Sequence, residues 1–76
     1  MTIITNENSI YLAKENGKGL VTVMARKTTF GDYLIEVAGP GFYEVLRSAK
    51  ILASRMIASF IGVDATEVEK ALQGVA

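Results

Sequence analysis

The chain contains neither cysteine nor histidine, and this absence limits its possible folds more than any other feature of the sequence. Its 76 residues predict a single domain, 1–76, with a small hydrophobic core. Natural domains of this size usually need a disulfide, a metal ion or a partner subunit for stability. Disulfides need cysteine and the usual zinc sites need cysteine or histidine, so we expect association with another protein chain.

Composition supports that expectation and argues against other partners. Half of the residues are apolar and the mean hydropathy is +0.31, which is high for a small monomer. The sequence therefore predicts a protein partner, with a homodimer as one form of it. Eight basic and eight acidic residues cancel, so the chain as a whole has no attraction to nucleic acid. Charged residues interrupt the longest apolar tract and no signal peptide is apparent, which predicts a cytoplasmic protein without membrane contact.

Alternating apolar and polar residues in the first half of the chain predict β-strands. The expected strands cover about 2–5, 9–14, 20–27 and 33–38, the first of them short. Asn16-Gly17 favours a hairpin turn, because both residue types tolerate positive φ. These segments predict an antiparallel meander of three or four strands, which Gly39-Pro40-Gly41 is expected to end.

The period changes after Gly41 to one that is typical of helices. A long helix over about 41–61 would gather its apolar residues on one stripe: Phe42, Val45, Leu46, Ala49, Leu52, Ala53, Met56, Ile57 and Phe60. Gly62 suits a left-handed C-terminal cap, and Asp64 suits the N-cap of a second helix over about 65–73. We therefore predict an α+β fold of order βββαα, with the long helix packed on one face of the sheet.

Catalysis is not expected from these residues. Without histidine or cysteine, the Ser-His-Asp and Cys-His designs are excluded. The acids Asp32, Glu36 and Glu44 suit a turn, a solvent-facing strand position and a helix N-terminus, so a metal or acid–base site is the weaker interpretation. We predict a non-enzymatic protein with no cofactor and no metal ion.

Two surfaces are candidates for a protein partner. Arg47, Ile51 and Arg55 would share the outer face of the long helix, where arginine around an apolar residue is typical of interface centres. The face of the sheet away from the helices would be too apolar for open water, and its candidate residues are Tyr11, Met24 and Leu34, joined by Phe30 at a loop tip.

Nucleic-acid binding is the alternative interpretation. Basic residues gather near the first predicted hairpin, close in sequence to Tyr11 and Phe30: Lys14, Lys18, Arg26 and Lys27. Basic and aromatic side chains together are typical of single-strand binding surfaces. Acidic residues balance these charges in the same half of the chain, and lysine on strand edges also discourages aggregation.

The favoured hypothesis is a small interaction module, an inhibitor or an adaptor, that acts by binding a larger protein or complex. In size, lack of catalytic residues and sheet-plus-helix build, the chain resembles the small phage-encoded inhibitors of bacterial defence, anti-CRISPR proteins among them. That resemblance concerns architecture only and assigns a role to no residue.

Overall fold

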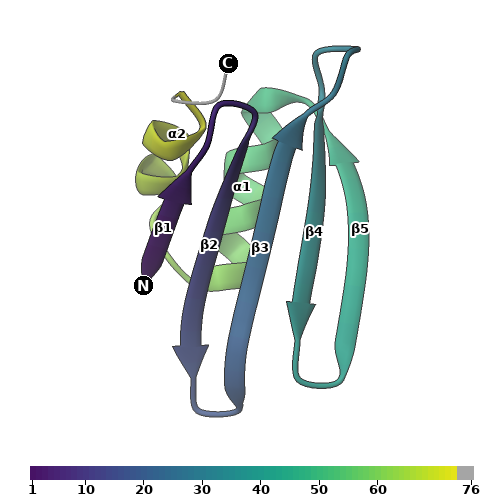
Figure 1. Ribbon diagram of the computed structural model, residues 1–76. Helices are drawn as coiled ribbons and strands as arrows, with labels where there is room; N and C mark the ends of the chain where they lie inside the picture. The colour runs from purple at the N-terminus through teal and green to yellow at the C-terminus, as the bar shows by residue number, and fades with distance from the viewer. Residues whose placement is uncertain (74–76) are drawn as a thin grey trace.

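A five-stranded antiparallel sheet forms one layer of the protein and two helices form the other (Figure 1). The computed structural model describes residues 1–73, apart from the side chains of Asn16, Lys50 and Ile51. The strands follow one another in sheet order as β1 (Thr2–Thr5), β2 (Ser9–Asn16), β3 (Gly19–Lys27), β4 (Tyr33–Gly39) and β5 (Phe42–Ser48). The helices are α1 (Lys50–Ile61) and α2 (Ala65–Gln73).

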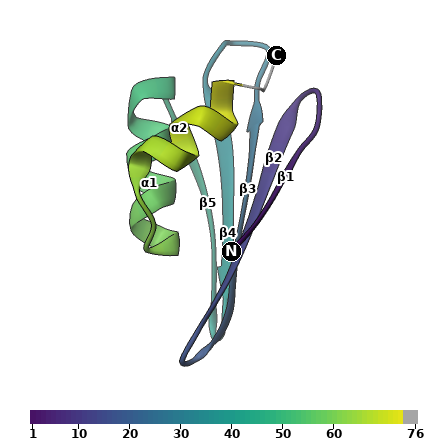
Figure 2. The same cartoon turned by 90° about the vertical axis from the view of Figure 1, so that its left-hand side faces the viewer.

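Both helices cover the same face of the sheet, and the other face has no covering layer among the described residues (Figure 2). Alternation along β2, β3 and β4 points every second side chain toward the helix side, and the apolar side chains among these are buried. α1 packs on β2, β3 and β4, and α2 packs on α1 and β2. The core lies between these layers and consists of Ile10, Leu12, Val21, Val23, Ala25, Tyr33, Ile35, Val37, Ala53, Ile57, Ala58, Ile61, Val68 and Leu72.

The α+β class is confirmed, but the expected long helix is wrong in its first part. Residues Phe42–Ser48 form β5, which pairs antiparallel with β4 along its whole length. Pro40 and Gly41 occupy the turn between them, where the missing N–H of proline is not needed, and Gly41 has φ +81°. Gly39-Pro40-Gly41 therefore joins two strands, and the sheet has five strands where three or four were expected.

The apolar stripe predicted for the long helix is divided accordingly. Phe42, Val45 and Leu46 belong to β5, where alternation places Val45 on the opposite side of the sheet from the other two. Leu52, within α1, is 54% exposed, whereas Ile57 is fully buried. The aromatic and branched residues of this run favour a strand, while the spacing of its apolar residues suits a helix, so pairing with β4 decided the outcome.

α1 ends and α2 begins as the local sequence predicts. Gly62 has φ 78° and ψ 39°, and its N–H donates to the Ala58 carbonyl at 2.7 Å, which is a left-handed C-terminal cap. Asp64 caps α2 by accepting a hydrogen bond from the Thr66 N–H at 3.0 Å. Hydrogen bonding from Thr66 lowers the pKa of the Asp64 carboxyl below its ordinary value, with the bond from the Thr66 backbone as the largest cause and the Thr66 side chain as the second. Neither α1 nor α2 is long and apolar enough to cross a membrane.

Candidate functional site

The helix-free face of the sheet exposes a row of mainly apolar side chains across all five strands. Strand register places Ile4, Tyr11, Met24, Glu36 and Val45 directly opposite one another in that order. Ile4 and Val45 are each 50% exposed and Met24 is 43% exposed. Adjacent strands lie about 4.8 Å apart, so this row is roughly 19 Å wide. We call it the central row.

A second row beside the central one carries two arginines. Register places Arg26 opposite Leu34 and Leu34 opposite Arg47, so the half-buried leucine lies between two guanidinium groups. Both arginines are exposed. This arginine row forms the end of the face nearest the β3–β4 loop.

The β3–β4 loop places an aromatic ring beside the arginine row. Phe30 is 83% exposed, and the Arg47 guanidinium carbon lies 5.6 Å from the centre of its ring, within cation–π range. The Arg47 Nε lies 3.1 Å from Asp32 Oδ2. Thr28 Oγ1 donates a hydrogen bond to Asp32 Oδ1 and accepts one from the Phe30 N–H at 3.2 Å. We call Thr28, Phe30, Asp32 and Arg47 the loop cluster.

Backbone hydrogen bonds further restrain this loop. The Thr28 N–H donates to the Asp32 carbonyl at 2.9 Å, and the Gly31 N–H donates to the Thr28 carbonyl at 3.1 Å. Gly31 has φ +88°, a conformation that favours glycine. The backbone that carries the exposed Phe30 ring is thus restrained by hydrogen bonds before any partner binds, which lowers the entropic cost of using the ring in a contact.

The other side of the central row carries a tyrosine–glutamate pair. The Tyr43 hydroxyl donates a hydrogen bond to Glu36 Oε2 at 3.2 Å. The pKa of Tyr43 is raised above its ordinary value by partial desolvation, then by the negative charge of Glu36 and by this hydrogen bond. The phenol therefore remains a neutral hydrogen-bond donor at neutral pH, and Glu36 is the acid within the central row.

The structure brings the predicted sheet residues together. Tyr11 and Met24 are neighbours in the central row, Leu34 lies in the arginine row, and Phe30 contacts that row through Arg47. The predicted helix face is wrong as a unit, because Arg47 lies on β5 while Arg55 is an exposed residue of α1. The side chain of Ile51 lies outside the described residues.

The four basic residues of the alternative interpretation do not form one patch. Alternation places Arg26 on the helix-free face, but Lys14 and Lys27 on the helix side. The Lys14 Nζ donates to the Gly62 carbonyl at 3.1 Å, at the end of α1. Lys18 lies in the turn between β2 and β3. A strand of nucleic acid could not contact all four at once on one face.

The three acids considered for a metal or catalytic site are also dispersed. Asp32 binds Arg47, Glu36 accepts from Tyr43, and alternation places Glu44 on the helix side of β5. Glu44 is thus not at a helix N-terminus as expected. Within residues 1–73, no three acidic side chains gather closely enough to hold a metal ion.

Sequence reasoning missed several residues of the helix-free face. Tyr43, Val45 and Arg47 join it only because β5 is a strand, and Ile4 joins it through its register with Tyr11. The strand propensity of Phe42, Tyr43 and Val45 was the available signal, but the helical spacing of the apolar residues competed with it.

Comparison with known proteins identifies no relative of this chain. No family model matches the chain, and no significant match is found among curated proteins or solved structures.

Proposed function

We propose that the chain is a non-enzymatic interaction module that binds a larger protein through the helix-free face of its sheet. The observation that carries the proposal is the central row, in which four of the five strands present an apolar or aromatic side chain and only β4 presents an acid, Glu36. Antiparallel sheets in water usually keep one face polar, so an apolar second face favours contact with another protein.

The residue types of this face favour a protein partner. Its strand positions carry Tyr11 and Met24 near the centre, Tyr43 on the edge strand β5, and Arg26 and Arg47 toward one end. Tyrosine, methionine and arginine are enriched at the centres of protein interfaces, whereas lysine is depleted. Lys14 and Lys27 lie on the helix side of the sheet, and Lys18 lies in the turn between β2 and β3.

The loop cluster supplies a preformed anchor and indicates the chemistry of the partner. Phe30 suits insertion into an apolar pocket, because it is both exposed and held by its neighbours. Arg26 and the exposed part of Arg47 favour an acidic group on the partner near that pocket. Such a partner would be larger than this chain, and the chain would act as its inhibitor or as an adaptor in the cytoplasm.

Nucleic-acid binding is the less favoured function, because its basic residues lie on different sides of the sheet. It predicts binding to single-stranded DNA that weakens steeply with salt.

The test compares partner capture by matched variants. Met24→Asp places a charge in the central row, and Leu52→Asp places the same charge at a similarly exposed position on α1. Circular dichroism and thermal melts first establish that each variant is folded. Tagged proteins then capture partners from cells of the native source, with quantification by mass spectrometry.

We expect one protein to be captured by the wild type and by Leu52→Asp, and to be lost with Met24→Asp. Retention by Met24→Asp would refute the proposal. Light scattering of the purified protein adds a second criterion. If the wild type is a dimer and Met24→Asp is a monomer, the partner of the helix-free face is a second copy of this chain and not a larger protein.

A further inference from the structure

The first strand is an unprotected sheet edge. β1 is the outermost strand, and within residues 1–73 its one pairing partner is β2. Its four residues, Thr-Ile-Ile-Thr, are all β-branched and all exposed. Natural edge strands are usually protected by charge, proline or a bulge, and β1 has neither charge nor proline. The opposite edge differs, since β5 carries Glu44 and Arg47.

Hydrogen bonding at the β1–β2 turn shows which backbone groups face the free edge. The Asn6 N–H donates to the Ser9 carbonyl at 2.8 Å, so the pair that closes the hairpin is a hydrogen-bonded one. Such pairs alternate along an antiparallel ladder, which makes Ile4–Tyr11 the next hydrogen-bonded pair. The N–H and C=O groups of Ile3 and Thr5 therefore point away from β2, toward the edge at which no strand of the described residues pairs with β1.

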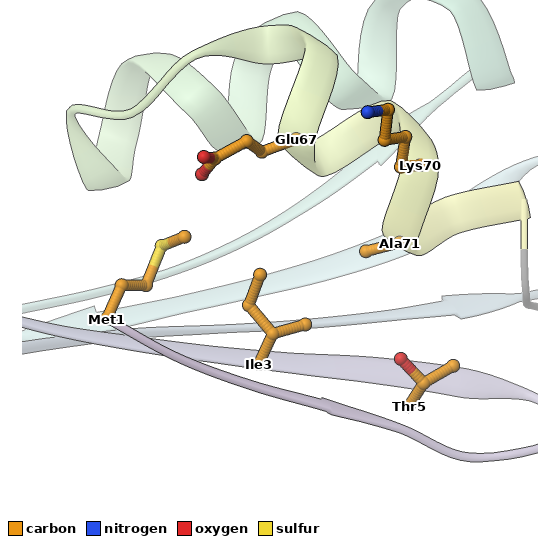
Figure 3. Close-up of a pocket in the computed structure, with 6 residues that line it drawn as sticks. All are labelled: Met1, Ile3, Thr5, Glu67, Lys70 and Ala71. Atoms are coloured by element: carbon orange, nitrogen blue, oxygen red, sulfur yellow. The ribbon is translucent and has the colours of Figure 1, made fainter.

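The same two residues line a groove between β1 and α2. Met1, Ile3 and Thr5 face Glu67, Lys70 and Ala71 across a cavity of about 610 Å³ (Figure 3). The groove is apolar along Met1, Ile3 and Ala71 and has one acid and one base on its helix wall. Its volume lies within the roughly 300–1,000 Å³ of typical ligand sites.

We propose that an extended segment of another protein binds here as a sixth strand, paired with β1 and lying under α2. Ile3 and Thr5 supply its backbone partners, as in strand addition to a sheet edge. Side chains of a strand alternate, so every second side chain of the segment enters the groove, where Ile3 and Ala71 favour apolar residues. The recognised segment has about four residues, apolar at alternate positions, because β1 has four.

A single extended segment fits this edge better than a second copy of the chain. In both views α2 lies at the β1 end of the sheet on the helix side, and in Figure 1 it reaches past β1. A two-fold pairing of β1 with β1 of another copy would bring a second α2 into the same space. A lone strand brings no helix, and Glu67 and Lys70 remain to pair with charges that flank its apolar residues.

The test uses a phage-displayed library of random octapeptides against the full chain. We expect enriched peptides to alternate apolar and polar residues over at least four positions. One enriched peptide is then synthesised and its affinity is measured by fluorescence polarisation. Thr5→Pro removes an N–H that faces the free edge, and proline is tolerated at such edge positions. Binding should weaken by about tenfold or more.

A second pair of variants tests the groove without changing the strand. Ala71→Glu introduces charge on the groove wall, and Gln73→Glu introduces the same charge elsewhere on α2. We expect about tenfold weaker binding for Ala71→Glu and about twofold or less for Gln73→Glu.

A library without alternating peptides, or binding unchanged by Ala71→Glu and Thr5→Pro, would overturn the inference. The inference would also be overturned if the wild type is a dimer and Thr5→Pro is a monomer, because a second copy would then occupy this edge. Met24→Asp should leave peptide binding unchanged, which keeps this site separate from the helix-free face.

Discussion

The packing of α1 predicts very different costs for two isomeric side chains of the same helix. Ile57 is 0% exposed and belongs to the core between the sheet and the helix layer, whereas Leu52 is 54% exposed. Ile57→Ala removes three buried carbons at about 0.8 kcal/mol each, or about 2.4 kcal/mol. The cavity left behind raises the expected loss to about 3–4 kcal/mol, within the range of buried isoleucine-to-alanine changes.

Leu52→Ala serves as the matched control. Half of this side chain is already in water, so its removal should cost about 1 kcal/mol with no cavity. For 76 residues the total free energy of unfolding is about 4–11 kcal/mol, so the Ile57 change removes a large part of it. Urea denaturation gives both losses, and thermal melts should separate the variants by roughly 8–24 °C.

Equal losses for the two variants would refute this packing. The predicted helical stripe placed both residues in the core, and that register predicts equal costs. A larger loss for Leu52→Ala would mean that α1 is rotated on the sheet.

Three further predictions concern single groups. Asp64→Asn keeps a capping side chain that cannot titrate. Because the pKa of Asp64 is lower in the folded state than in the unfolded state, the wild type should lose stability as the pH falls from about 4 through the folded pKa. Urea denaturation of the variant should lack this loss. Gly62→Ala should cost about 1 kcal/mol in urea melts, because φ is positive there, while Gly17→Ala, in open space, should cost less. Glu36→Gln should lower the pKa of Tyr43 toward its ordinary value in an NMR titration, and an unchanged pKa would contradict their hydrogen bond.

Local signals in the sequence were sufficient for much of the fold. Alternation located strands near those of β1 to β4, and the caps at Gly62 and Asp64 were read from short-range chemistry. The lack of cysteine and histidine excluded disulfides and imidazole chemistry outright. The pairing of Tyr11, Met24 and Leu34 with a helix-free face followed from alternation alone, because the period of a strand fixes its two faces.

Tertiary structure decided whether Phe42–Ser48 forms a helix or a strand. Its side chains fit a helical stripe and a strand about equally well, and pairing with β4 across the Pro40-Gly41 turn selected the strand. That choice moved Arg47 from a helix to the helix-free face, where it meets Asp32 and Phe30. The groove beside β1 was equally invisible in the sequence, because it depends on where α2 lies relative to a strand about sixty residues earlier. Short-range chemistry fixes which residues alternate or cap, but the surfaces that a partner would contact arise from the packing of distant segments.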